Sequence, residues 1–206
     1  MRIYDITLPI ESTLAAWPGD TPYTFTSNLK ICNGESVNLG SVSLSVHTGS
    51  HADAPYHYDD SGETIEQLSL SVYLGPAMVV DVSGKSVIQC ADLPSELLSQ
   101  APRLLLKTDS WTDHTRFPET VPVLASEVPA YLQAHGIFLL GLDVPSVDAL
   151  DSKDLPIHHA LGACRIHILE SLLLAEVPPG LYELTALPLK LVGADGSPVR
   201  AILREP

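Results

Sequence analysis

The chain has 206 residues, of which 45% are hydrophobic and 17% charged, a composition typical of one folded globular domain. Its 11 basic and 25 acidic residues give a formal net charge of −14, and the basic residues do not cluster, which argues against nucleic-acid or anionic membrane partners. No apolar run approaches the roughly 20 residues of a membrane-spanning helix. The three cysteines form no CxxC pair, so no disulfide framework or thiolate zinc site is indicated. We therefore expect one cytoplasmic domain over residues 1–206 that binds neither nucleic acid nor membrane.

Short strands dominate the predicted elements. Residues 41–47 alternate polar and apolar side chains, which predicts a strand that ends near His47, with its apolar residues on one face. Four further segments have the apolar or alternating pattern of strands in a buried sheet: 77–82, 104–107, 138–142 and 165–170. In the last of these, Glu170 shares a face with isoleucines, where a carboxylate is costly unless it is paired or bound to a metal.

Helical signals are fewer. Residues 92–98 offer an N-cap at Asp92 and an early proline, and residues 126–135 are followed by a glycine at the position of a C-cap. The end of the chain returns to strands over 182–191 and 199–204, around a turn cluster at 193–198. Because the strands do not alternate regularly with helices, the pattern predicts a mixed α+β domain with a central β-sheet and a few flanking helices.

One segment, residues 47–60, is unusually rich in metal-ligand side chains. His47, His51 and Asp53 supply the nitrogen and oxygen donors that a divalent metal such as zinc binds. A glycine and a proline inside the segment disfavour a helix, which excludes the HExxH arrangement of zinc proteases and favours a turn. A single histidine is more often a surface residue, but three histidines and an aspartate within eleven residues favour a metal site. No such role is expected for the isolated histidines His114, His135 and His167.

The run from His47 to His57, His-Thr-Gly-Ser-His-Ala-Asp-Ala-Pro-Tyr-His, closely resembles the HxGTHxDxPxH signature of the cyclase-like metal-dependent hydrolases. Ser50 stands where the signature has threonine, so the hydroxyl is kept. Shorter matches extend over nearly the whole chain and narrow the resemblance to the bacterial-type kynurenine formamidases, or arylformamidases: Asp5-Ile6, Trp17-Pro18-Gly19-Asp20, 141–148, 168–170, 186–189 and 197–201.

The resemblance implies a site for two divalent metal ions, Zn²⁺ in the first place and Mn²⁺ as the alternative. It assigns five metal ligands, of which the two carboxylates bridge the ions: His47, His51, Asp53, His158 and Glu170. His159 is adjacent to His158 and leaves the register open, although the spacing to Glu170 favours His158. The resemblance further implies His57 as the catalytic acid/base and Trp17 as a substrate contact.

The chemistry of these residue types agrees with that assignment. A metal ion lowers the pKa of bound water from about 15.7 toward about 7, and histidine, with an ordinary pKa of about 6.5, suits proton transfer to a departing nitrogen. The resemblance thus implies a hydrolase that converts N-formyl-L-kynurenine and water to L-kynurenine and formate, a step of tryptophan degradation. Two alternatives stay open: hydrolysis of another aryl or cyclic amide such as isatin, and a metal-dependent binding protein without turnover. A nucleophile-based esterase is disfavoured because no GxSxG motif occurs.

The resemblance also implies how the chain folds and assembles. The fold would be of the swivelling β/β/α type, with a single domain built on a central, barrel-like sheet. The assembly would be a homodimer whose pockets lie near the subunit interface. Apart from a second copy of the chain, the expected partner is a small aromatic amide substrate.

Overall fold

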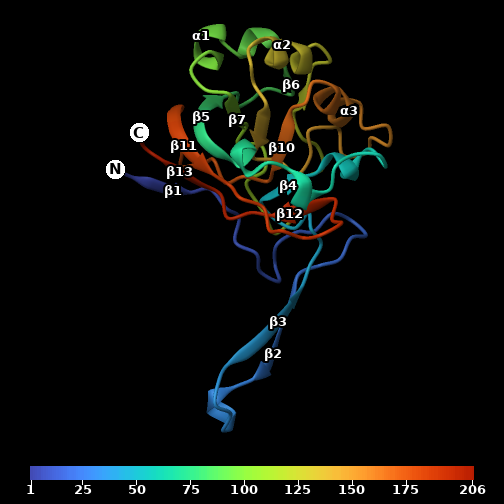
Figure 1. Cartoon of the computed structure of the whole chain (residues 1–206), viewed down its shortest axis with the longest axis vertical. Coiled ribbons are helices and arrows are strands. Elements are labelled where there is room, and N and C mark those ends of the chain that lie inside the picture. Colours follow the sequence, from blue (N-terminus) through green and yellow to red (C-terminus); the bar gives the residue numbers. More distant parts are fainter.

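The computed structural model, which describes residues 1–206, has a mixed α+β fold built on one curved nine-stranded sheet (Figure 1). The order of the strands is β1-β13-β11-β5-β7-β9-β10-β4-β12. Four neighbouring strands at its centre are parallel: β5 (Leu74–Asp81), β7 (Arg103–Lys107), β9 (Leu139–Leu142) and β10 (His167–Glu170). The strands on either side pair antiparallel: β1 (Ile3–Asp5), β13 (Ile202–Arg204), β11 (Gly180–Thr185), β4 (His51–Asp53) and β12 (Gly196–Pro198).

The parallel strands are buried on both faces, as their continuous apolar sequences predict. On β7, Leu104 and Leu106 pack into one hydrophobic cluster, whereas Leu105 packs into the other. The first cluster also contains buried residues of the helices α1 (Ser95–Leu98), α2 (Val128–Ala134) and α3 (Pro156–Ala163), which lie together above the sheet in Figure 1. The strands predicted over 77–82, 104–107, 138–142 and 165–170 are therefore confirmed.

The helices agree with the sequence in part. α2 lies within the predicted range 126–135 but begins two residues later, and Gly136 follows its C-cap with a positive φ of 75°. α1 begins later than expected, because a 3₁₀ turn over Cys90–Asp92 precedes it and Pro94 occupies the N-cap. α3 was not predicted, since its sequence contains adjacent histidines and a glycine rather than a clear apolar stripe. No helix of the structure is long and apolar enough to cross a membrane.

A two-stranded hairpin projects from the body of the molecule (Figure 1). It consists of β2 (Thr24–Leu29) and β3 (Leu39–Ser43), which pair only with each other. The strand predicted over 41–47 is thus wrong in extent: it ends at Ser43, and Val42 is 58% exposed instead of facing a core. Alternation alone does not reveal whether the apolar face of a strand meets a sheet within the same chain.

Shorter elements complete the fold. β6 (Val87–Ile88) and β8 (Val123–Leu124) form a small parallel pair. Further 3₁₀ turns lie at Ile31–Asn33, Pro55–His57, Ile65–Gln67 and Leu70–Tyr73. Near the end of the chain, the strand predicted over 182–191 runs only from 180 to 185, and the predicted turn cluster contains β12, which pairs with β4.

Candidate metal centre

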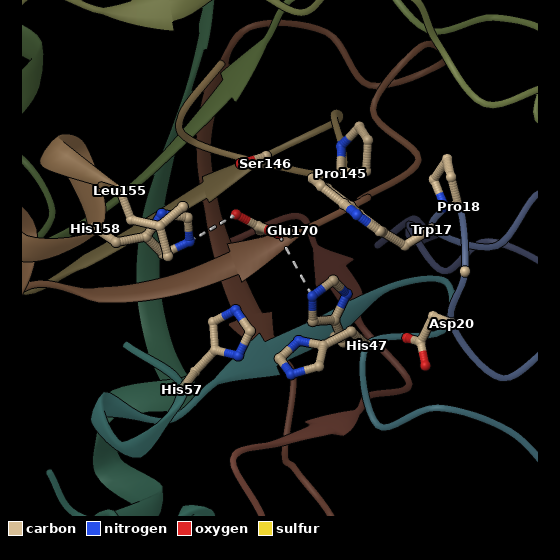
Figure 2. Close-up of a pocket in the computed structure, with 12 residues that line it drawn as sticks. Trp17, Pro18, Asp20, His47, His57, Pro145, Ser146, Leu155, His158 and Glu170 are labelled. Carbon is tan, nitrogen blue, oxygen red and sulfur yellow. Dashed lines mark ion pairs between the residues drawn. The ribbon is translucent and has the colours of Figure 1, made fainter. Parts of the chain in front are cut away.

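The candidate metal-binding side chains come from two neighbouring strands and the segments that flank them (Figure 2). On β4 and β10, His51 and Glu170 are directly paired residues, so their side chains leave the same face of the sheet. Asp53, two residues after His51, leaves that face as well. His47 belongs to the turn before β4, and His158 to the first turn of α3.

Asp53 lies at the centre of this cluster. Its Oδ1 is 3.1 Å from Nδ1 of His47 and 3.4 Å from Nε2 of His51, and its Oδ2 is 3.6 Å from Nε2 of His158. The side chain is buried, and neither oxygen has a hydrogen-bond partner. Because burying a carboxylate without hydrogen bonds is costly, Asp53 requires cationic charge in its immediate surroundings.

The contacts of the Glu170 carboxylate resemble those of Asp53. Its Oε2 is 3.5 Å from Nε2 of His51. Its Oε1 is 3.6 Å from Nε2 of His158 (Figure 2). Oε1 also accepts a hydrogen bond from the backbone N–H of Val147. Asp53 and Glu170 therefore each direct one oxygen toward His51 and the other toward His158, which is the arrangement of carboxylates that bridge two positions.

The spacing of these atoms fits metal coordination. Two donors that bind one tetrahedral ion at about 2.0–2.2 Å lie roughly 3.3–3.6 Å apart, and the nitrogen–oxygen distances here are 3.1–3.6 Å. Two groups of three donors, which share Asp53, could each hold an ion: His47, His51 and Asp53, and Asp53, His158 and Glu170. A third group beside them consists of His47, His57 and Asp195. Imidazole nitrogens and carboxylate oxygens are the donors that zinc and similar divalent ions prefer.

Hydrogen bonds fix which ring nitrogen of each buried histidine faces the cluster. Nδ1–H of His51 donates to the backbone oxygen of Gly49 at 2.8 Å, so Nε2 is the free donor atom. Nδ1–H of His158 donates to Oδ2 of Asp148 at 2.7 Å, again leaving Nε2 toward the carboxylates. Asp148 also accepts hydrogen bonds from the backbone N–H groups of Ile157 and His158. The same carboxylate therefore orients the ring of His158 and satisfies free N–H groups at the start of α3.

Carboxylates also control the charge of these histidines. Burial disfavours the imidazolium form of His51, but Asp53 and Glu170 outweigh it and raise the pKa of His51 to about 10. Burial also lowers the pKa of His158, but hydrogen bonds to Asp148 and Asp53 outweigh this effect and raise the pKa to about 10. Without a metal, the cluster therefore holds protons on its imidazoles, and a cation that binds there must displace them.

The cluster lines an open cleft of about 480 Å³ (Figure 2). Trp17 lies at one wall, 40% exposed, with its ring held edge-to-face against Phe117 at a centroid distance of 5.1 Å. Asp20 and Glu170 also line the cleft, whereas no lysine or arginine does. The cleft thus combines an aromatic wall with metal-ligand side chains.

His57 lies beside the cluster, at the end of the 3₁₀ turn that follows β4. Its ring is 4.1 Å from the ring of His47, between centroids, and it lines the same cleft. One oxygen of Asp195 reaches both rings, at 2.9 Å from Nε2 of His47 and 3.3 Å from Nδ1 of His57. Burial lowers the pKa of His47, but Asp195 and Asp53 raise it to about 9.

Six of the seven residues singled out from the sequence line this cleft, and the seventh, Asp53, is buried in contact with three of them. His158 is buried in the cluster, whereas His159 is exposed and lies against Tyr58, so the structure places His158 at the candidate ligand position. Sequence reasoning missed Asp148 and Asp195, whose carboxylates hold the histidines from behind. Asp148 lies within a segment that carried the family resemblance, but Asp195 lies in a turn cluster where an aspartate is common for local reasons.

A curved sheet in an α+β fold, with a buried histidine–carboxylate cluster at a cleft, defines a class of protein whose side chains could hold a divalent metal. The sequence profile of the family described as "Putative cyclase" matches residues 4–149. A protein of Geobacillus thermodenitrificans (strain NG80-2) named kynurenine formamidase is 47% identical over 98% of this chain and 96% of its own. The chain therefore belongs to the cyclase family.

Solved structures agree with this assignment. One described as a potential metal-dependent hydrolase with cyclase activity is 30% identical, has a TM-score of 0.83, and covers 100% of this chain and 99% of its own. Isatin hydrolase A from Labrenzia aggregata, bound to benzyl benzoate, also has a TM-score of 0.83 at 20% identity, covering 98% of this chain and 93% of its own. At that identity the likeness shows the fold alone.

Proposed function

We propose that this protein is a metal-dependent arylformamidase that hydrolyses N-formyl-L-kynurenine to L-kynurenine and formate. The observation that carries the choice of substrate is the 47% identity, over 98% of the chain, to a protein named kynurenine formamidase. The donor cluster beside an aromatic cleft wall supports the same reaction, because amide hydrolysis needs an activated water and an aryl substrate needs an apolar surface.

Two divalent ions, with zinc as the first choice, fit the donor set. One would be held by His47, His51 and Asp53 and the other by Asp53, His158 and Glu170, since each group of donor atoms lies within 4.8 Å. The ions would supply a Lewis acid for the formyl oxygen and lower the pKa of bound water. The buried carboxylates neutralise the ions, and Asp148 keeps Nε2 of His158 directed at the site.

His57 is the residue that we assign to proton transfer. Hydrolysis breaks the bond between the formyl carbon and the aniline nitrogen, and that nitrogen must take a proton as it leaves. His57 lines the cleft, and its Nδ1 is occupied by Asp195, which leaves Nε2 to hold or release a proton. It is not one of the five candidate ligands around Asp53, although it forms a further group of three donors with His47 and Asp195.

Trp17 is the residue that we assign to the aryl ring of the substrate. Its indole face is half open to the cleft, and the edge-to-face contact with Phe117 holds it in one orientation. A flat, rigid apolar wall near the metal ligands orients an aromatic formamide with its reacting group toward the cluster.

A homodimer is the assembly that we propose, with the projecting hairpin as a contact between copies. The hairpin exposes five large apolar side chains: Phe25, Ile31, Val37, Leu39 and Val42. An isolated two-stranded hairpin is only marginally stable in water, and exposed apolar side chains in such numbers mark an interaction surface. A second copy of the same chain is the partner that the family resemblance implies.

The proposal is tested by assaying metal-analysed protein on N-formyl-L-kynurenine, on isatin and on a simple formanilide. We expect the highest kcat/KM on N-formyl-L-kynurenine, and loss of activity on treatment with a chelator that is reversed by Zn²⁺ or Mn²⁺. Faster turnover of isatin would favour the cyclic-amide alternative. Metal binding without turnover of any of the three amides would favour a binding protein.

A further inference from the structure

Asp195 occupies an unusual position between two histidines. It directly precedes β12, whose Gly196 pairs with Asp53 of β4, so the register of the sheet delivers its side chain to the edge of the cluster. The backbone oxygen of Asp195 also accepts a hydrogen bond from the N–H of Ala54, which fixes the turn. The residue is 148 positions away from His47 in the chain, yet its carboxylate contacts the ring.

A single oxygen of Asp195 accepts hydrogen bonds from both rings, and this determines where their protons lie. When Nε2–H of His47 donates to it at 2.9 Å, the lone pair of His47 is on Nδ1, the atom that faces Asp53 at 3.1 Å. When Nδ1–H of His57 donates to it at 3.3 Å, the lone pair of His57 is on Nε2. A carboxylate cannot donate, so it selects these tautomers for the two neutral rings.

Asp195 is placed to support the ring of His47, and not to bind the same metal ion as Asp53. The two carboxylates contact opposite nitrogens of the His47 ring, so that ring lies between them. The close approach depends on Gly196, because a Cβ there would come within 2.9 Å of the His47 ring. The absence of a side chain at Gly196 therefore lets the Asp195 carboxylate reach Nε2 of His47.

We propose that Asp195 is a positioning residue that couples the metal-ligand shell to proton transfer, by fixing His47 as an Nδ1 ligand and His57 as an Nε2 base. The catalytic part of this inference rests on the proposed function, whereas the tautomer of His57 can be measured without any substrate.

The first test is ¹⁵N NMR of the histidine rings, in the metal-free and the Zn²⁺-loaded protein. In the wild type we expect His57 as the Nδ1–H tautomer. Asp195→Ala removes the acceptor, and we expect His57 to shift toward the Nε2–H tautomer that an unrestrained histidine prefers. Asp195→Asn keeps an acceptor oxygen without the charge, so the Nδ1–H tautomer should survive. Asp60→Asn, at an exposed aspartate, is the matched control and should change nothing.

The second test combines Asp195→Ala with His57→Ala, assayed at saturating Zn²⁺. Zinc affinity should fall roughly 10–100-fold in Asp195→Ala, as is usual when a residue that orients a ligand is lost. With metal saturating, kcat on the formamide should still fall by about 10-fold or more, whereas the same substitution should cost less than about 3-fold when His57 is already absent. KM should change little in either background.

Three results would overturn the proposal. The first is an unchanged His57 tautomer in Asp195→Ala. The second is an equal loss of kcat with and without His57, which would mean that Asp195 acts on the fold in general. The third is the loss of one whole ion at saturating Zn²⁺, which would make Asp195 a ligand. The first and third results do not depend on which amide is the natural substrate, so failure of the proposed function would leave the NMR and metal-content outcomes unaffected.

Discussion

At the scale of single residues, the candidate metal centre is arranged around Asp53. Its carboxylate is buried, has no hydrogen bond, and lies within 3.6 Å of nitrogens from three histidines. Buried charges persist in folded proteins only when other charges compensate them. A cluster of this kind is therefore best understood as a cation site that the metal-free protein fills with protons.

The first prediction concerns Glu170→Gln, which keeps the shape of the side chain and removes its charge. We expect metal content to fall much more than the stability of the metal-free protein, because the amide is a poor ligand but can keep the hydrogen bond from Val147. Elemental analysis and thermal unfolding measure the two effects. Glu176→Gln, at an exposed glutamate, is the control. Full metal content with a lowered Tm would mean that Glu170 serves a buried ion pair only.

The second prediction concerns His57→Ala, which separates binding from catalysis. Both metals should stay bound, since the five candidate ligands remain, while turnover should fall by roughly 10²–10⁴-fold. The loss should be largest for amides with poor leaving groups and smaller for activated aryl esters, whose phenolates need little protonation. KM should change less than kcat. Equal losses on amides and activated esters would exclude proton transfer as the role of His57.

The third prediction follows from the raised pKa values of His51 and His158, both about 10 in the metal-free protein. An unfolded histidine has a pKa of about 6.5, so these imidazolium groups stabilise the folded state fully below that pH. The stabilisation is lost as the pH rises toward 10. We expect the Tm of the metal-free protein to fall between pH 6.5 and 10.

In the metal-loaded protein the same imidazoles are neutral at every pH in this range, so its Tm should change less. The Tm difference between the two forms should therefore widen as the pH rises. Metal binding near pH 7 should also release protons, which calorimetry in buffers of different ionisation enthalpy measures. A Tm difference that is constant over the range would show that the histidines are neutral before the metal binds.

At the scale of secondary structure, α3 and the loop before it position His158. Asp148 accepts hydrogen bonds from the first turn of the helix and from the His158 ring, so one side chain links the helix start to the site. Leu155, the residue before α3, has a left-handed φ of 41°, which brings the chain sharply into the helix. With this start, the first turn of α3 carries Nε2 of His158 to within 3.6 Å of Oδ2 of Asp53 on β4.

The fourth prediction is that Asp148→Ala weakens both the helix and the metal site. Losing hydrogen bonds to a buried charged group should lower the free energy of unfolding by about 1–3 kcal/mol, and losing the partner of His158 should lower metal affinity roughly 10–100-fold. Denaturant unfolding of the metal-free protein and zinc titration measure these effects. Asp151→Ala, at an exposed aspartate in the same loop, is the control. Unchanged zinc affinity would restrict Asp148 to helix capping.

The elements differed in how far the sequence revealed them. The central strands were predictable because their apolar runs lie between turn residues, as on β7 and β9. The candidate ligands His47, His51 and Asp53 were predictable because they are close in sequence. Asp195 could not be found in this way, because strand pairing between β12 and β4 brings it to the site and no local pattern records that pairing.

At the scale of the whole molecule, the projecting hairpin is the feature that the sequence did not predict. Its strands have ordinary alternation, but their apolar face meets no other part of the chain. Phe25 lies over Gly40 of the opposite strand, where the missing Cβ leaves room for the ring. The hairpin thus has internal order but lacks a surface to pack against.

The fifth prediction is that Phe25→Ser combined with Val42→Ser converts the proposed dimer to a monomer. The two residues are paired across the hairpin, and burying both against a second copy would supply much of the contact energy. Size-exclusion chromatography with light scattering measures the mass. Val192→Ser, at an apolar residue that is 83% exposed outside the hairpin, should leave the dimer intact. A dimer that survives the double substitution would require another interface.

The pairing of β12 with β4 also determines when the site can form during synthesis of the chain. β4 carries His51 and Asp53. The strand that pairs with its outer edge, β12, exists only after residues 196–198 have been made. β10, its other neighbour, ends at Glu170. A ribosome that adds roughly 5–20 residues per second therefore produces the metal-ligand residues several seconds before the strands that hold them can assemble. The complete candidate site therefore forms only after β12 has paired with β4.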